Sequence, residues 1–171
     1  GYDLITTALV NERVFRRSNT SVAFYKTGEY VLAYNNETGG LSVFSLPELE
    51  LVQFQIEGYA ATAPQWSPTE PKFVIGVSNE QPHLNVGIYL VDVTTAQSRL
   101  IDTVANPGGG SSILRWSDHG HYILSTPQAV TDATSTTLID VQTGSMSALA
   151  QSFASTLTIV NWSINDEYAL L

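Results

Sequence analysis

The sequence contains no cysteine, and this absence excludes several kinds of site. Without a thiol there is no disulfide, no cysteine nucleophile, no zinc finger and no iron–sulfur cluster. A chain of 171 residues buries roughly 70% of its unfolded surface, so its fold needs no covalent or metal cross-link. We therefore expect an apolar core to stabilise the fold.

Basic residues are scarce, and long apolar runs are absent. Seven Lys and Arg against 16 Asp and Glu give a net charge of −9, which repels nucleic-acid phosphates and anionic membrane surfaces. The longest apolar run, residues 86–91, is far shorter than the roughly 20 residues that cross a bilayer. We therefore expect no nucleic-acid partner and no membrane insertion.

A repeat dominates what is present. Four segments place an aromatic anchor before a short polar turn and a second aromatic after it. The anchors Phe24, Trp66, Trp116 and Trp162 are 42, 50 and 46 residues apart. That period is typical of a four-stranded propeller blade.

A second motif recurs in phase with the anchors. Residues 43–47, 90–94 and 138–142 follow their anchors by about half a period and lead into turns. β-Branched and aromatic residues dominate between the turns, and no segment keeps a helical apolar stripe. The sequence therefore predicts an all-β chain.

The fold class that we predict is a β-propeller built of four-stranded antiparallel blades. The blades span about residues 20–56, 57–104 and 105–150, with partial blades at 1–19 and 151–171, in one propeller domain or a segment of one. The predicted strands are 20–25, 30–34, 41–45, 51–55, 61–66, 72–77, 87–92, 98–102, 111–116, 122–126, 136–140, 146–149, 157–162 and 168–171. Residues 3–9 and 12–16 could pair with the last strands to close a four-bladed ring. We expect instead an arc that further chain of the same protein completes.

The turn Trp66-Ser67-Pro68 and the strand at residues 88–95 resemble the WD40-like propeller repeat of TolB-type proteins. Prolyl-oligopeptidase relatives contain the same repeat. The Asp-Gly of that family's turn is replaced here by Thr69-Glu70 in one repeat and by Asn165-Asp166 in another. The resemblance implies a propeller without catalytic residues, and a periplasmic or extracellular location. The absence of Cys and the low Lys content agree with that location.

The predicted topology separates short connections from long ones. Because neighbouring strands run in opposite directions, the turns after the first and third strands of each blade lie on one face, and the longer loops lie on the other. The long loops contain no Lys or Arg, so we predict an acidic, polar binding face for a protein partner with a basic or neutral polar surface. The alternative is that these loops are only solvated connections. The candidate contacts are Glu37, Glu57, Tyr59, Glu80, His83, Asp132 and Phe153.

Other conspicuous residues have structural explanations. Trp66, Trp116 and Trp162 occupy equivalent repeat positions, so we expect them to be buried between blades rather than to stack on a ligand. Asp92 and Asp140 end matched strands, where we expect them to stabilise turns. The segment 118–121 offers two His and an Asp, but it fills a hairpin-turn position, and we predict neither a metal nor a cofactor.

No catalytic constellation is visible in the sequence. It lacks a Gly-x-Ser-x-Gly elbow, and no spacing pairs a base with an orienting group. We therefore predict a non-catalytic module for protein–protein interaction or ligand binding. Two alternatives stay open: a gating propeller of a prolyl-oligopeptidase-like serine peptidase whose catalytic domain lies outside this chain, and a structural subunit of a larger assembly.

Overall fold

The structure, a computed structural model, describes residues 20–35, 38–56, 59–60, 62–78, 86–104, 112–127, 135–151, 161–163, 166 and 169–170. These ranges consist of strands and their connections and include no helix, which confirms the all-β prediction. No helix in the described ranges is therefore long and apolar enough to cross a membrane.

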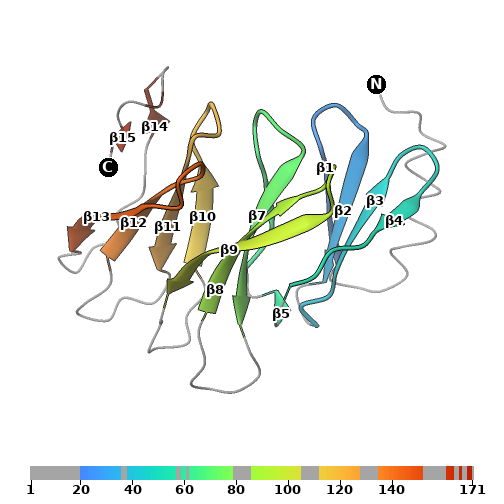
Figure 1. Cartoon of the computed structure of the whole chain (residues 1–171), viewed down its shortest axis with the longest axis horizontal. Coiled ribbons are helices and arrows are strands. Elements are labelled where there is room, and N and C mark those ends of the chain that lie inside the picture. Colours follow the sequence, from blue (N-terminus) through green and yellow to red (C-terminus); the bar gives the residue numbers. More distant parts are fainter. Residues whose placement is uncertain are drawn as a thin grey trace.

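Successive antiparallel sheets stand side by side in chain order (Figure 1). Blade 1 contains β1 (Thr20–Phe24), β2 (Tyr30–Asn35), β3 (Leu41–Ser45) and β4 (Glu50–Val52). Blade 2 contains β5 (Tyr59–Ala60), β6 (Gln65–Trp66), β7 (Lys72–Ser78), β8 (Val86–Asp92) and β9 (Gln97–Val104). Blade 3 contains β10 (Ser112–Trp116), β11 (Tyr122–Pro127), β12 (Ser135–Asp140) and β13 (Met146–Gln151). A fourth sheet pairs β14 (Asn161–Trp162) with β15 (Ala169–Leu170).

Of the described residues in the predicted strand at 61–66, only the last two form a strand, β6, and the short strand β5 comes just before the predicted range. Both β5 and β6 pair with β7, and Thr62 lies between them. The backbone N–H of Gly76 donates to Thr62 Oγ1 at 2.8 Å. A side-chain hydroxyl thus takes the place of a backbone acceptor in the ladder, and the strand is interrupted there.

Gly76→Ala should destabilise the protein by about 1–2 kcal/mol, because the added methyl group overpacks this site. A Cβ at position 76 would lie 2.8 Å from Thr62 Cγ2 and 3.0 Å from Thr62 Oγ1. Urea unfolding measures the loss. Thr62→Ser removes the nearer atom, so adding Gly76→Ala to Thr62→Ser should cost less than adding it to wild type. Equal costs in the two backgrounds would contradict this account.

The predicted strand at 51–55 ends early, at Val52. β4 pairs with β3 only from Ser45↔Glu50 to Val43↔Val52, and residues 53–56 leave the sheet. Val52, Phe54 and Ile56 are half-buried against the core between blades 1 and 2, while Ser98 Oγ donates to the carbonyl of Gln55. Because these apolar side chains pack between blades 1 and 2, residues 53–56 turn away from the edge of blade 1.

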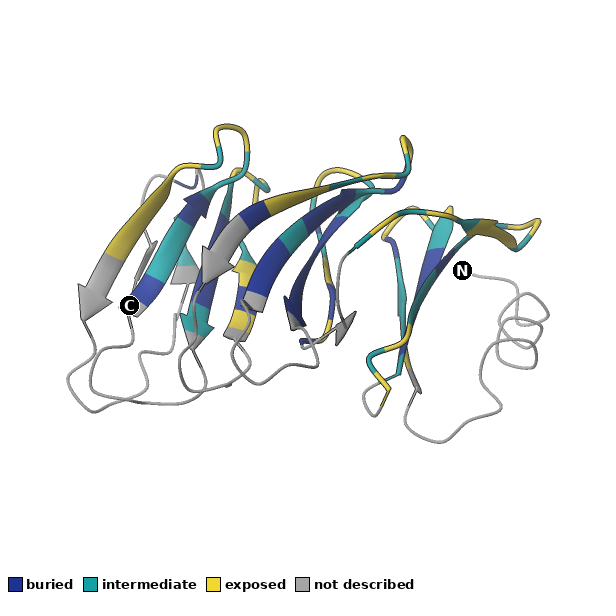
Figure 2. Ribbon diagram, turned by 60° about the horizontal axis from the view of Figure 1, so that its bottom comes forward, coloured by how far each residue is buried: buried dark blue, intermediate teal, exposed yellow. Residues whose placement is uncertain are grey.

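The core lies between blades rather than inside any one of them. Phe73, Ile75 and Val77 of β7 join the cluster shared with blade 1, whereas Val74 joins the cluster shared with blade 3. Alternate side chains of a strand point to opposite faces, so β7 contributes to both clusters. Figure 2 shows the buried residues along the sheets and exposed ones at the turns.

The repeated tryptophans connect consecutive blades. Trp66 Nε1 donates to the carbonyl of Ala23 at 3.1 Å, and Trp116 Nε1 donates to the carbonyl of Gln65 at 2.9 Å. Each acceptor directly precedes the anchor of the previous repeat. The inter-blade position of Trp66 and Trp116 is thus as predicted, but the three tryptophans are less buried than predicted: Trp66, Trp116 and Trp162 are half-buried. Each of the first two indoles reaches a strand-end carbonyl, which leaves part of the ring accessible.

Candidate functional site

Most of the predicted contacts of the long-loop face lie outside the described residues, namely Glu37, Glu57, Glu80, His83, Asp132 and Phe153. Tyr59 is the first residue of β5 and pairs with Ser78, but its side chain is also outside the described part. The acidic binding face therefore stays a prediction.

The predicted gathering of the short turns on one face is confirmed, whereas most of the long loops lie outside the described residues. In each blade the turn after the third strand donates a backbone N–H to the turn after the first strand. The bonds are Leu46 N–H to the Glu29 carbonyl at 2.7 Å, Val93 N–H to the Pro71 carbonyl at 3.0 Å and Val141 N–H to the His121 carbonyl at 2.9 Å. The short turns therefore share one face, which we call the turn face.

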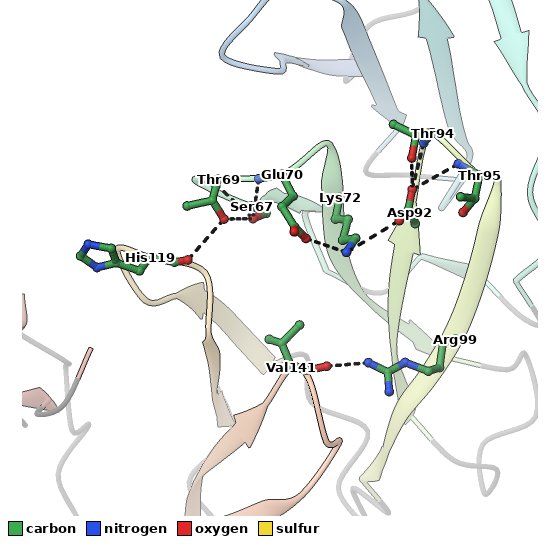
Figure 3. Close-up of polar contacts among 10 residues, drawn as sticks. All are labelled: Ser67, Thr69, Glu70, Lys72, Asp92, Thr94, Thr95, Arg99, His119 and Val141. Carbon is green, nitrogen blue, oxygen red and sulfur yellow. Dashed lines mark hydrogen bonds and ion pairs between the residues drawn. The ribbon is translucent and has the colours of Figure 1, made fainter. Parts of the chain in front are cut away.

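Asp92 and Asp140 stabilise turns, as predicted. Asp92 Oδ1 accepts bonds from the backbone N–H groups of Thr94 at 3.0 Å and Thr95 at 3.2 Å (Figure 3). Burial alone would raise the pKa of Asp92, but the bond from the Thr94 hydroxyl at 2.6 Å, these two backbone bonds and the Lys72 ammonium outweigh it and lower the pKa. Asp140 Oδ1 accepts from the N–H of Thr143 at 2.8 Å, and this bond lowers the Asp140 pKa.

A buried carboxylate joins blade 3 to the fourth sheet. Asp166 accepts a bond from Ser117 Oγ at 2.5 Å and from the N–H of His119 at 3.1 Å. The Nδ1 atoms of His119 and His121 each lie 3.5 Å from an Asp166 oxygen, and the Asp166 side chain is 0% exposed. Burial would raise the pKa of Asp166, but the bonds from Ser117, His119 and His121 lower it.

Asp166 takes a backbone conformation that glycine has elsewhere in the repeat. Its φ of 58° matches the left-handed values of Gly28 and Gly120, 83° and 76°. Sequence reasoning identified the turn but missed the carboxylate's role, because its partners are 47 and 49 residues away. The segment 118–121 forms the predicted turn, closed by Gly120 N–H on the Ser117 carbonyl. Among the described residues, no three His, Asp or Glu side chains are placed to hold a metal ion.

A cleft of about 1150 Å³ lies between blades 1 and 2 in the described part of the chain, and we call it the β3 cleft. One wall is the start of β3, with Leu41 and Ser42. The other wall is residues 51–56, and residues 96–98 of blade 2 close it. It exists because residues 53–56 turn away from β3.

The chemistry of the β3 cleft is that of hydrogen bonding and apolar contact. Its described lining includes the glutamines 53, 55 and 97, the serines 42 and 98 and several apolar side chains, and no described residue of this lining is charged. Gln53 and Gln97 are exposed at the surface. Sequence reasoning missed this site, because an alternating pattern at 52–56 looks the same whether or not the strand stays paired.

A smaller cleft of about 570 Å³ lies between Trp66 and Trp116. Ile113, 43% exposed, and Arg115 line it on β10. Both tryptophan N–H groups are bonded to backbone carbonyls, and the lining combines the indole rings with polar and charged residues such as Gln65 and Asp118.

No protein-family model matches the sequence, and no curated protein matches it. Solved structures do match. The chain is similar to TolB from Acinetobacter baumannii, with a TM-score of 0.53 and 16% identity over 80% of this chain and 33% of that one. It is also similar to a putative TolB from Agrobacterium tumefaciens, with a TM-score of 0.54 and 20% identity over 77% of this chain and 45% of that one.

A third similar structure comes from a study of two prolyl endopeptidases. Its TM-score is 0.54 at 13% identity, over 79% of this chain and 22% of that one. The chain therefore spans less than half of each of these proteins. Identities this low show the fold alone: the chain has the fold of a partial β-propeller.

Proposed function

We propose that this chain is a non-catalytic β-propeller module that binds a protein partner through the β3 cleft. The observation that carries the proposal is a ligand-sized cleft lined by both apolar side chains and exposed amides, on blades fixed to each other by the tryptophan and turn contacts. Binding sites combine apolar walls with a few polar groups in this way.

The groups of the β3 cleft support binding rather than chemistry. Amides and aliphatic side chains neither accept nor donate a proton near neutral pH, and the Ser98 hydroxyl is bonded to the Gln55 carbonyl. The net charge of −9 favours a neutral or basic partner over an acidic one. The similarity to TolB structures supports an extracytoplasmic location as part of the same proposal.

A second candidate function is the gating propeller of a serine peptidase, which the similarity to a prolyl endopeptidase favours. In that case the same gene encodes a Gly-x-Ser-x-Gly nucleophile elbow outside this chain. Sequencing the complete reading frame decides between the two.

Peptide selection tests the binding proposal. Peptides selected on the wild-type chain from a random displayed library should be neutral or basic. Gln97→Trp obstructs the cleft mouth, and it should weaken their binding at least roughly tenfold in calorimetry, which corresponds to about 1.4 kcal/mol. The control is Gln142→Trp, an exposed glutamine in the turn between β12 and β13 of blade 3. Equal affinity for wild type and Gln97→Trp would contradict the proposal.

A further inference from the structure

We propose that the β3 cleft binds its partner by strand addition: an extended segment of the partner protein lies beside Leu41 and Ser42 and completes blade 1. This inference rests on the proposed function and specifies the binding mode and the chemistry of the partner. Three observations carry it, concerning the backbone, the space and the charge.

The backbone at the start of β3 has an open edge. On its inner side β3 pairs with β2 along its whole length, from Tyr30↔Ser45 to Tyr34↔Leu41. On its outer side β4 covers only Val43 to Ser45. In the described part of the chain, no strand pairs with the outer side of Leu41 and Ser42. Successive residues of a strand direct their N–H and C=O groups to opposite sides, so one of these two residues presents them outward.

The space beside this edge is the cleft itself. In blade 2 the corresponding space is filled, because β9 pairs with β8 from Asp92↔Gln97 to Val86↔Val104. In blade 3, β13 pairs with β12 as far as Ser135↔Gln151. In blade 1 the segment that would fill it, residues 53–56, forms the opposite wall of the cleft of about 1150 Å³. An added strand therefore gives blade 1 the width that its neighbours have at this level.

The side chains around the edge define the partner. Leu41, Phe54 and Ile56 present apolar surface inside the cleft, while Gln53 is exposed at its surface. The described lining of the cleft holds no basic residue, and the chain carries a charge of −9. A segment with apolar side chains at alternate positions and lysine or neutral residues between them complements this edge, whereas an acidic segment is repelled.

The absence of cysteine makes a direct test possible. Gln97→Cys places a single thiol at the cleft, and Gln142→Cys places one in the turn between β12 and β13 of blade 3, away from the cleft. The probe is a synthetic peptide with a cysteine, a Gly-Gly spacer and the sequence Lys-Val-Thr-Val-Lys, joined by a disulfide. A second probe has the same sequence with N-methyl groups on Val, Thr and Val, so its backbone donates no bonds there. The readout is amide hydrogen exchange at Leu41 and Ser42, followed by NMR.

We expect the unmodified peptide on Gln97→Cys to slow exchange of one of these two amides at least roughly tenfold, since a new ladder bond protects it. The same peptide on Gln142→Cys should leave both amides unchanged. Replacing the two lysines with glutamates should lower the fraction captured by Gln97→Cys in a competition between the two peptides.

Three results would overturn strand addition. One is unchanged exchange in the Gln97→Cys adduct. Another is equal binding of the N-methylated peptide, seen as chemical-shift changes at Leu41 and Gln53; in that case cleft binding stands and strand addition fails. The third is slow exchange of both amides in the free protein, which would mean that another part of the chain or a second copy already covers the edge. Native mass spectrometry shows whether a second copy is bound, and so distinguishes it from another part of the same chain.

Discussion

Phe73→Ala should lower the free energy of unfolding by about 3–5 kcal/mol, the largest loss that we expect from one substitution. Phe73 is 0% exposed on β7. Its ring contacts Phe54 at 5.7 Å and Trp66 at 5.5 Å between centroids, both edge to face. Removing the ring leaves a cavity bounded by β7, by β6 and by the segment that crosses from blade 1. These elements are held by separate contacts, so they cannot all move in to fill it.

Urea unfolding of Phe73→Ala measures this loss. Leu100→Ala provides the control within the same blade, because Leu100 on β9 is 44% exposed and its truncation should cost less than about 1 kcal/mol. A Phe73→Ala variant within about 1 kcal/mol of wild type would mean that blades 1 and 2 do not pack on this ring.

Asp166→Ala should destabilise the protein by about 2–3 kcal/mol, because it leaves a buried hydroxyl and an N–H without their charged acceptor. Ser117 is 0% exposed and has its 2.5 Å bond to Asp166. Alanine is also strained at the left-handed φ of 58°. Asp166→Gly separates the lost acceptor from the backbone strain. Glycine is not strained at this φ, so Asp166→Gly should destabilise the protein less than Asp166→Ala does, but it should still destabilise it because the acceptor is lost. Thermal unfolding of both variants provides the comparison.

The contribution of Asp166 to the free energy of unfolding should decrease as the pH falls. Folding lowers the pKa of this carboxyl group, so the folded state favours the ionised form. The stabilisation is then complete above the ordinary aspartate pKa of about 3.9 and is lost as the pH falls through the lower folded value. The difference in unfolding free energy between wild type and Asp166→Asn should be largest above about pH 5 and should shrink toward about pH 3. A difference that stays constant to pH 3 would contradict this assignment.

The strands were predictable because their signals are local. Each aromatic anchor ends a strand, and the polar turn after it determines where the next strand begins. Tyr122, for example, is the first residue of the predicted strand at 122–126 and of the observed β11. The Asp at the end of the third strand likewise marks a turn through its own bonds to the next residues. Neither feature depends on the rest of the fold.

The features that sequence reasoning missed depend on contacts between distant segments. The alternation of Val52, Phe54 and Ile56 indicates that one side of this segment is buried. It does not indicate that Phe54 and Ile56 pack against blade 2 while their backbone leaves the sheet of blade 1. Thr62 interrupts its strand because of Gly76, 14 residues away. The β3 cleft follows from the first of these departures, so no local pattern could indicate it.

The contacts along the turn face connect each blade with the next: Lys26 Nζ donates to the Pro68 carbonyl, Thr69 Oγ1 to the His119 carbonyl and Ser117 Oγ to Asp166. A molecule linked in this way behaves as a linear array with nearest-neighbour coupling, in which the junctions rather than the units carry the cooperativity. Weakening one junction then uncouples the array at that point. A single steep denaturation curve becomes two shallower steps, although every blade keeps its own hydrogen-bonded strands.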